Sequence, residues 1–260
     1  MLKHSEFLEV LEKFAPLSLS KLMIDNGSYD NSGALIKCSN QVGKILFSLD
    51  LSLEVVNKAI ELGCDTIVTH HPAIYNPIKS LDIDQDTAPV LYAVKNGINV
   101  FSMHLNLDIA NEGIDSSLAF ALGAENARII DLIDGVHGYG REFKSGQNVN
   151  DFVNLIKKNL DTEKVIYYGE GVCNMVASFC GGGASEALKA VASGLTCADT
   201  VVTSDAPHHV VKELVERNIK LIIIPHYSAE EYGFNKFYAR VKAQLGDKAQ
   251  AYYFQDKRFM

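Results

Sequence analysis

The stretch Asp65-Thr66-Ile67-Val68-Thr69-His70-His71-Pro72 decides how the rest of the chain is interpreted. Thr66–Thr69 is typical of a short buried strand, and Pro72 ends it because proline cannot donate a hydrogen bond to a sheet. The two histidines therefore follow a strand end, which is where α/β proteins bind ligands. Side chains alternate along a strand, so His70 and His71 start on opposite sides and suit two neighbouring metal ions better than one. The alternative is a pair of ordinary polar loop residues.

The segments around this stretch alternate between apolar strands and amphipathic helices. Strands are expected at 44–49, 66–69 and 98–103, with helices at 52–62 and 87–96 between them. Ser52 is expected to cap the first of these helices, and Gly63 to end it. This alternation predicts right-handed crossovers and a parallel sheet. Before it, a helix is expected over 5–14, and the polar segment that follows, up to Gly33, is expected to be a loop.

The second half of the chain repeats this pattern after an irregular section. Helices are expected near 114–122, 151–160, 185–193, 208–217 and 229–245, and strands at 164–168, 174–180, 199–203, 220–224 and 249–254. The Gly-rich section 129–150 is expected to join two lobes. Asp199–Thr203 resembles Asp65–Thr69 closely, which indicates a weak internal duplication. We therefore expect an α/β fold of two similar, facing lobes with largely parallel sheets, divided into residues 1–128 and 129–260.

Three groups of histidines and carboxylates follow predicted strands. They are His70-His71, His104 with Asp108, and His226 with Glu230. Imidazole and carboxylate donors suit Zn, Mn, Fe, Ni or Co ions, and no thiolate set for a closed structural zinc site is present. Two carboxylates and three or more histidines exceed what one tetrahedral ion needs, so a bridged pair of ions explains them better. The alternative is that Asp108 and Glu230 cap helices while the histidines are satisfied polar residues.

Composition narrows the class of protein. The 260-residue chain carries a formal charge of −8, which argues against a general nucleic-acid binder or an anionic membrane surface as partner. No apolar run approaches the length of a membrane span, and the N-terminal residues show no signal-peptide core. The five cysteines never form a C-x-x-C pair and resemble reduced thiols of a cytoplasmic protein. A cytoplasmic globular protein is expected.

Four motifs carry a specific resemblance over essentially the whole chain. They are Asp30-Asn31-Ser32-Gly33, Ile67-Val68-Thr69-His70-His71-Pro72, His104-Leu105-Asn106-Leu107-Asp108 and His226-Tyr227-Ser228-Ala229-Glu230. In this order they resemble the NGG-interacting-factor-three-like family, whose bacterial members are labelled GTP cyclohydrolase I type 2 homologues. The chain departs from that pattern at Tyr29, where Trp is frequent, and at Leu105, where Thr is usual. Neither position is a proposed ligand, so these departures bear on substrate choice.

The resemblance implies a ligand set, an assembly and an activity. His70, His71, Asp108, His226 and Glu230 would hold two divalent metal ions, in a toroidal homohexamer of the chain. GTP ring opening is the implied reaction, which makes a small-molecule nucleotide the implied substrate. From the residues alone, a hydrolase in which the ions activate water is the leading hypothesis, with phosphoester cleavage as a related reaction. A non-enzymatic metal-binding ring with an assembly, regulatory or metal-handling role is the alternative.

Three further features are assigned weaker roles. The turn Gly181-Gly182-Gly183 is expected to serve strand-to-helix geometry, although its N–H groups could bind a phosphate. Arg141 could bind an anion, but an interface or surface position is the more frequent role of such an arginine. His208 and His209 lack a carboxylate at useful spacing and are expected to face solvent.

Overall fold

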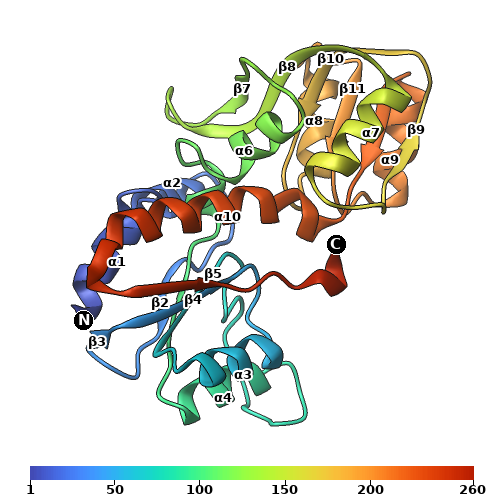
Figure 1. Ribbon diagram of the computed structural model, residues 1–260. Coiled ribbons are helices and arrows are strands. Elements are labelled where there is room, and N and C mark those ends of the chain that lie inside the picture. The colour runs from blue at the N-terminus through green and yellow to red at the C-terminus, as the bar shows by residue number, and fades with distance from the viewer. The chain divides into compact units, whose positions relative to one another are not determined.

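The computed structural model describes residues 1–260 and divides into two compact units (Figure 1). Unit 1 comprises Met1–Ala110 and Phe234–Asp256, and unit 2 comprises Asn111–Gly233 and Lys257–Met260. The chain therefore enters unit 2 before residue 128, and its C-terminal segment returns to unit 1. The sequence analysis expected one boundary, between residues 128 and 129, whereas unit 1 is built from two separate segments of the chain.

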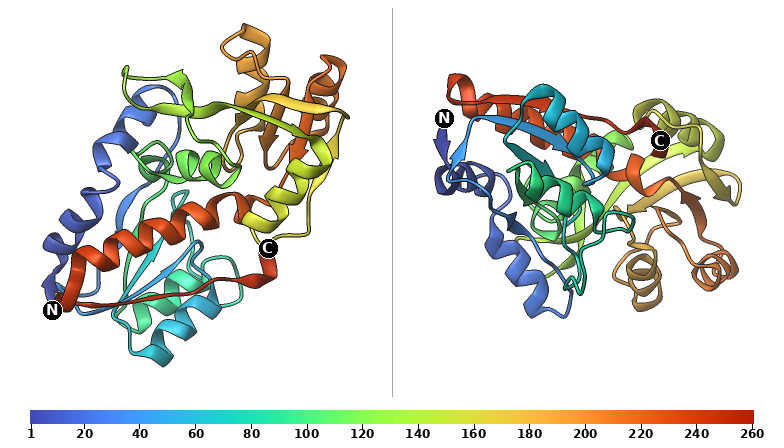
Figure 2. Two further views of the ribbon diagram at one scale, coloured as in Figure 1. Left: turned by 45° about the horizontal axis from the view of Figure 1, so that its top comes forward. Right: turned by 90° about the horizontal axis from the view of Figure 1, so that it is seen from below.

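Unit 1 is built on a five-stranded sheet in the order β13-β4-β5-β6-β2. Its strands are β13 (Gln250–Tyr253), β4 (Lys44–Ser48), β5 (Thr66–Thr69), β6 (Asn99–Ser102) and β2 (Gly33–Ile36). The first four are parallel, and β2 pairs antiparallel with β6 at one edge. The red strand in Figure 2 is β13, which lies beside β4 although about 200 residues separate them in sequence. The predicted parallel α/β sheet is confirmed.

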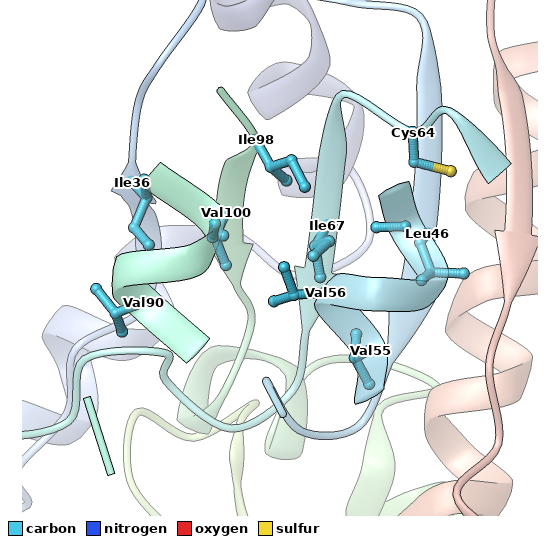
Figure 3. Close-up of a cluster of buried hydrophobic side chains, with 11 residues drawn as sticks. Ile36, Leu46, Val55, Val56, Cys64, Ile67, Val90, Ile98 and Val100 are labelled. Carbon is cyan, nitrogen blue, oxygen red and sulfur yellow. The ribbon is translucent and has the colours of Figure 1, made fainter. Parts of the chain in front are cut away.

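The helices α3 (Leu53–Leu62) and α4 (Ala88–Lys95) cover one face of this sheet. Ser52 caps α3 by accepting the Val55 N–H at 3.2 Å, and Gly63 ends it with a φ of 65°, as predicted. Figure 3 shows the resulting core, in which side chains of both helices pack on Leu46, Ile67 and Val100. These three strand residues are fully buried. Burial of each of these side chains contributes roughly 1.5–3 kcal/mol. This core therefore stabilises the strands that carry the candidate site residues at their ends.

Aromatic side chains cover the opposite face of the unit 1 sheet. Phe7 of α1 (His4–Glu12) packs edge-on against Phe101 of β6, with ring centroids 5.2 Å apart. Phe234 and Phe237, in the part of α10 (His226–Leu245) that belongs to unit 1, pack on Phe47 at 6.2 Å. The unit is therefore a three-layer α/β structure.

The prediction of a loop between the first helix and Gly33 is wrong for residues 17–25. This segment forms α2 (Leu17–Asp25), which starts after Pro16. Its serines obscured the apolar pattern, because Ser20 is buried like an apolar residue and donates a hydrogen bond to Asp30 at 2.5 Å. A short two-stranded sheet of β1 (Leu2–Lys3) and β3 (Gln41–Val42) completes this end of unit 1.

Unit 2 is built on a six-stranded sheet in the order β7-β8-β10-β11-β12-β9. Its strands are β7 (Arg128–Leu132), β8 (Gly138–Asn148), β10 (Val172–Ser178), β11 (Thr200–Thr203), β12 (Lys220–Ile223) and β9 (Ile166–Tyr168). The central strands β10, β11 and β12 are parallel, and the outer ones are antiparallel to their neighbours. Four helices lie wholly in this unit, and the first part of α10 also belongs to it; the four are α6 (Ile114–Ala121), α7 (Val149–Asn159), α8 (Ala184–Ser193) and α9 (His208–Glu216).

The prediction of an irregular join over residues 129–150 is wrong. The segment forms most of the antiparallel pair β7–β8. Its charged residues conceal the strand pattern, because Arg141 and Glu142 are both buried in β8 and each is ion-paired. Gly140 is required there, since its φ is 76° and a Cβ would overlap the Phe179 ring.

The predicted duplication corresponds to equivalent structures in the two units. Asp65 accepts a hydrogen bond from the Gly43 N–H at 2.9 Å, and Asp199 accepts one from the Asn174 N–H at 3.1 Å. The threonine after each aspartate donates to it at 2.8 Å. β5 lies between two parallel neighbours in unit 1, as β11 does in unit 2. No helix, including the 20-residue α10, has the length and apolar character that crossing a membrane requires.

Candidate metal centre

The carboxyl ends of the unit 1 strands bring histidines and a carboxylate together. β5 runs into His70 and His71, while β6 is followed by His104 and by the one-turn helix α5 (Leu105–Asp108). His70 Nε2 lies 3.5 Å from Asp108 Oδ1. One ligand atom from each of His70, His104 and Asp108 lies within 4.8 Å of the others. The structure thus groups two predicted ligands with His104, whose role the sequence left open.

Each histidine of this cluster has its Nδ1 atom bonded to an oxygen. The acceptors are the Met103 carbonyl for His70 (2.8 Å), Asp50 for His71 (2.7 Å) and Asp30 for His104 (2.8 Å). Because these oxygens accept the hydrogen bond, Nδ1 is the donor, and in the neutral form of each ring the lone pair is on Nε2. A neutral histidine held in this way is oriented for metal binding through Nε2. The arrangement matches the chemistry of a metal site.

Asp30 is the buried carboxylate behind His104. Burial by itself would raise its pKa, but hydrogen bonds from His104, Ser20 and Ser32 outweigh burial and leave the pKa below its ordinary value. Ser32 also accepts the His104 N–H at 3.1 Å. Asp30 therefore stays ionised and fixes the ring of His104 directly and its backbone through Ser32.

Unit 2 contains a histidine and a carboxylate that lie on one helix. α10 begins at His226, and Glu230 follows one turn later, with His226 Nε2 3.2 Å from Glu230 Oε1. Asp205 accepts a hydrogen bond from His226 Nδ1–H, which repeats the pattern seen in unit 1. Asp205 has a φ of 44°, a left-handed conformation that is costly for a residue other than glycine and recurs at functional sites.

Gly181 makes room for this pair. Its φ is 55°, and a Cβ at this position would overlap Glu230 Oε1 and lie 3.4 Å from His226 Nε2. Gly183 is similarly restricted, because a Cβ there would overlap the Tyr139 hydroxyl. Close packing therefore explains two of the three glycines of the Gly181-Gly182-Gly183 turn. The Sγ atom of Cys180, next to Gly181, lies within 4.8 Å of a Glu230 carboxylate oxygen.

Arg141 is neither a surface residue nor an open anion site. It is buried and lies 2.8 Å from the Asp115 carboxylate, which is fully buried. Burial raises the pKa of Asp115 to about 6, although Arg141 and the N–H groups of Cys180 and Gly140 act in the opposite direction. The pair is thus a buried structural ion pair. His208 and His209 are exposed at the start of α9, as expected.

The sequence interpretation missed the carboxylates that orient the histidines. Asp50 lies two residues beyond β4, and Asp205 lies two residues beyond β11. Both follow buried strands at the carboxyl edge of a parallel sheet, which is the signal that could have identified them. Asp205 also occupies the position that corresponds to His71 in the repeated stretch.

The fold and these side chains define a class: a two-unit α/β protein with histidine–carboxylate groups of the metal-binding kind at its strand ends. The family model Duf34/NIF3 (NGG1p interacting factor 3) matches residues 2–257. The chain therefore belongs to the DUF34/NIF3 family.

Individual relatives agree with this membership. A Clostridium perfringens protein named GTP cyclohydrolase 1 type 2 homolog is 29% identical over 254 residues, covering 94% of this chain and 93% of the relative. The crystal structure of a Staphylococcus aureus hypothetical protein matches with a TM-score of 0.83 and 26% identity, covering 98% of this chain and 96% of that one. Reduced HcgD from Methanocaldococcus jannaschii matches with a TM-score of 0.81 and 27% identity, covering 97% of each chain.

Proposed function

We propose that the chain binds two divalent metal ions through His70, His71, Asp108, His226 and Glu230. The observation that carries this proposal is that Nδ1 of each of the three histidines makes a hydrogen bond to an oxygen atom. All three of these histidines donate Nδ1–H to a carboxylate or carbonyl oxygen, so each is oriented to bind through Nε2. Nitrogen and oxygen donors of this kind suit Zn, Mn, Fe, Ni or Co. His104 is a candidate additional ligand in unit 1, because it shares the same orientation.

The side chains around the ligands would hold them in the protonation state that metal binding requires. Asp50 and Asp205 keep the proton of their histidines on Nδ1. Asp108 and Glu230 are almost fully buried carboxylates, and the positive charge of a bound ion would stabilise their ionised form. When bound, the ions would supply that charge together with Lewis acidity toward a substrate and toward water.

We further propose that the protein is a metal-dependent hydrolase. This proposal is supported by the donor set and by relatives that carry the name GTP cyclohydrolase 1 type 2 homolog. A nucleotide is the first substrate to test, followed by phosphomonoesters and phosphodiesters. The toroidal homohexamer and the cytoplasmic location remain predictions.

Hydrolysis by the metal-loaded protein tests this proposal. GTP and a panel of phosphoesters should be incubated with the wild type and with His71→Ala, with His209→Ala as the matched control at an exposed histidine. We expect turnover that is lost on chelation, restored by added divalent ion and reduced by orders of magnitude in His71→Ala alone. If the wild type turns over none of these compounds faster than His71→Ala, the hydrolase proposal fails. A non-enzymatic metal-binding role would then be favoured.

A further inference from the structure

Two exposed tyrosines form a pair on the surface of unit 1. The side chains of Tyr29 and Tyr75 are 51% and 44% exposed, and their ring centroids lie 5.0 Å apart at an interplanar angle of 76°. The Tyr29 hydroxyl donates a hydrogen bond to the Tyr75 carbonyl at 2.7 Å. The pair is thus held together while a large part of both rings faces solvent.

The pair borders the histidine cluster of unit 1. The Tyr75 ring lies 6.1 Å from the His104 ring at an interplanar angle of 90°. The His104 ring in turn lies 5.3 Å from that of His70 and 6.0 Å from that of His71. A molecule in contact with Tyr75 would therefore be beside the candidate metal ligands.

The loop that orients His104 also positions Tyr75. Asn31 donates to the Ile74 carbonyl at 2.6 Å, next to the hydrogen bond that Tyr29 makes with Tyr75. The neighbouring Asp30 accepts a hydrogen bond from His104 Nδ1–H. Residues 70–87 contain no helix or strand, and loops of this length within a compact fold usually have a function. Two anchor points therefore fix an otherwise irregular segment at the edge of the cluster.

We infer that Tyr75, supported by Tyr29, is the stacking surface for a planar heteroaromatic ring of the substrate, of the size and kind of a purine. Tyr29 and Tyr75 leave large parts of their rings exposed beside the candidate ligands, so these rings are accessible to a flat ring of a bound molecule. Aromatic side chains bind nucleobases by stacking, because every base has a π-face. The inference rests on the proposed function, because it places the substrate beside the proposed metal ligands.

Binding of inosine tests this inference without requiring turnover. The dissociation constant should be measured by calorimetry for the wild type, Tyr75→Phe and Tyr75→Leu, with ribose as the ligand that lacks the ring. Tyr167→Leu is the matched control, because Tyr167 is a comparably exposed tyrosine in unit 2. We expect Tyr75→Leu to weaken inosine binding roughly 10- to 100-fold, while Tyr75→Phe and Tyr167→Leu leave it within about twofold. Ribose should bind to none of these proteins.

Metal content measured on the same samples separates this inference from the proposed function. We expect Tyr75→Leu to keep the full metal content of the wild type. The inference is wrong if the wild type and Tyr75→Leu bind inosine equally, or if the metal-loaded wild type does not bind inosine. Either result would leave the metal proposal unaffected. Loss of metal by Tyr75→Leu would also overturn the inference, because the residue would then support the ligands instead of the substrate.

Discussion

Single residues near the candidate ligands are restricted by space as well as by chemistry. Gly181 is the clearest case, because the closest atom to a Cβ at this position belongs to the Glu230 carboxylate. A flexible side chain can move away at low cost, so we expect Gly181→Ala to displace Glu230 without unfolding the protein. The φ of 55° adds a strain of about 1 kcal/mol for alanine.

This prediction is checked by metal analysis and thermal unfolding of Gly181→Ala. We expect a loss of most of the bound metal and a small decrease in melting temperature. Gly182→Ala is the matched control, since no atom lies within 4 Å of a Cβ there and its φ is not positive. Full metal content in Gly181→Ala would show that the Glu230 position seen here is not needed for binding.

At the scale of elements, the buried charge in β8 contributes to stability in a pH-dependent way. Glu142 is buried and accepts hydrogen bonds from Arg128 at 2.6 Å, from the Cys197 N–H at 2.9 Å and from the Thr196 hydroxyl. Burial by itself would raise its pKa, but these hydrogen bonds outweigh burial and lower the pKa below the ordinary 4.5. The ionised form is therefore favoured by folding, and its stabilisation is present above pH 4.5 and lost as pH falls through the folded-state pKa.

Glu142→Gln should reduce the free energy of unfolding by about 1–3 kcal/mol at pH 7. Chemical denaturation between pH 3 and 7 should show this difference shrinking below about pH 4.5, because Glu142 is protonated first in the unfolded chain and, at lower pH, in the folded protein as well. Glu216→Gln, which removes one partner of an exposed pair with Lys212, should change stability by less than about 1 kcal/mol. If Glu142→Gln lowers the free energy of unfolding equally at pH 3 and pH 7, the assignment of an ionised Glu142 in the folded protein is wrong.

The elements that could be predicted from sequence are those whose apolar pattern is uninterrupted. β5 and α3 were predicted closely because buried strands and capped amphipathic helices carry local signals. α2 and β8 were missed because each contains polar residues that a distant partner satisfies: Ser20 with Asp30, and Arg141 with Asp115. Periodicity within a short window cannot reveal such partners.

At the scale of the whole molecule, the sequence predicted the α/β class and the duplicated strand but not how the chain is shared between the units. The return of β13 to the sheet of unit 1 is a long-range pairing that no local pattern encodes. The motif residues followed strand ends, so they could be chosen as ligand candidates. The orienting carboxylates Asp50 and Asp205 also follow strand ends, but their pairing with particular histidines depends on the conformation of loops, which no local pattern encodes.

The central proposal is that the chain binds two divalent metal ions through the five ligands named above, and metal stoichiometry tests it most directly. The wild type, Asp108→Ala, Glu230→Ala and the control Glu216→Ala should each be reconstituted with a divalent ion and freed of unbound ion. Their metal content should then be measured by mass spectrometry. We predict about two ions per chain for the wild type and Glu216→Ala. Asp108→Ala and Glu230→Ala should each lose most of the metal and retain the circular dichroism of the wild type. One ion or none in the wild type, or full metal content in both ligand variants, would contradict the claim.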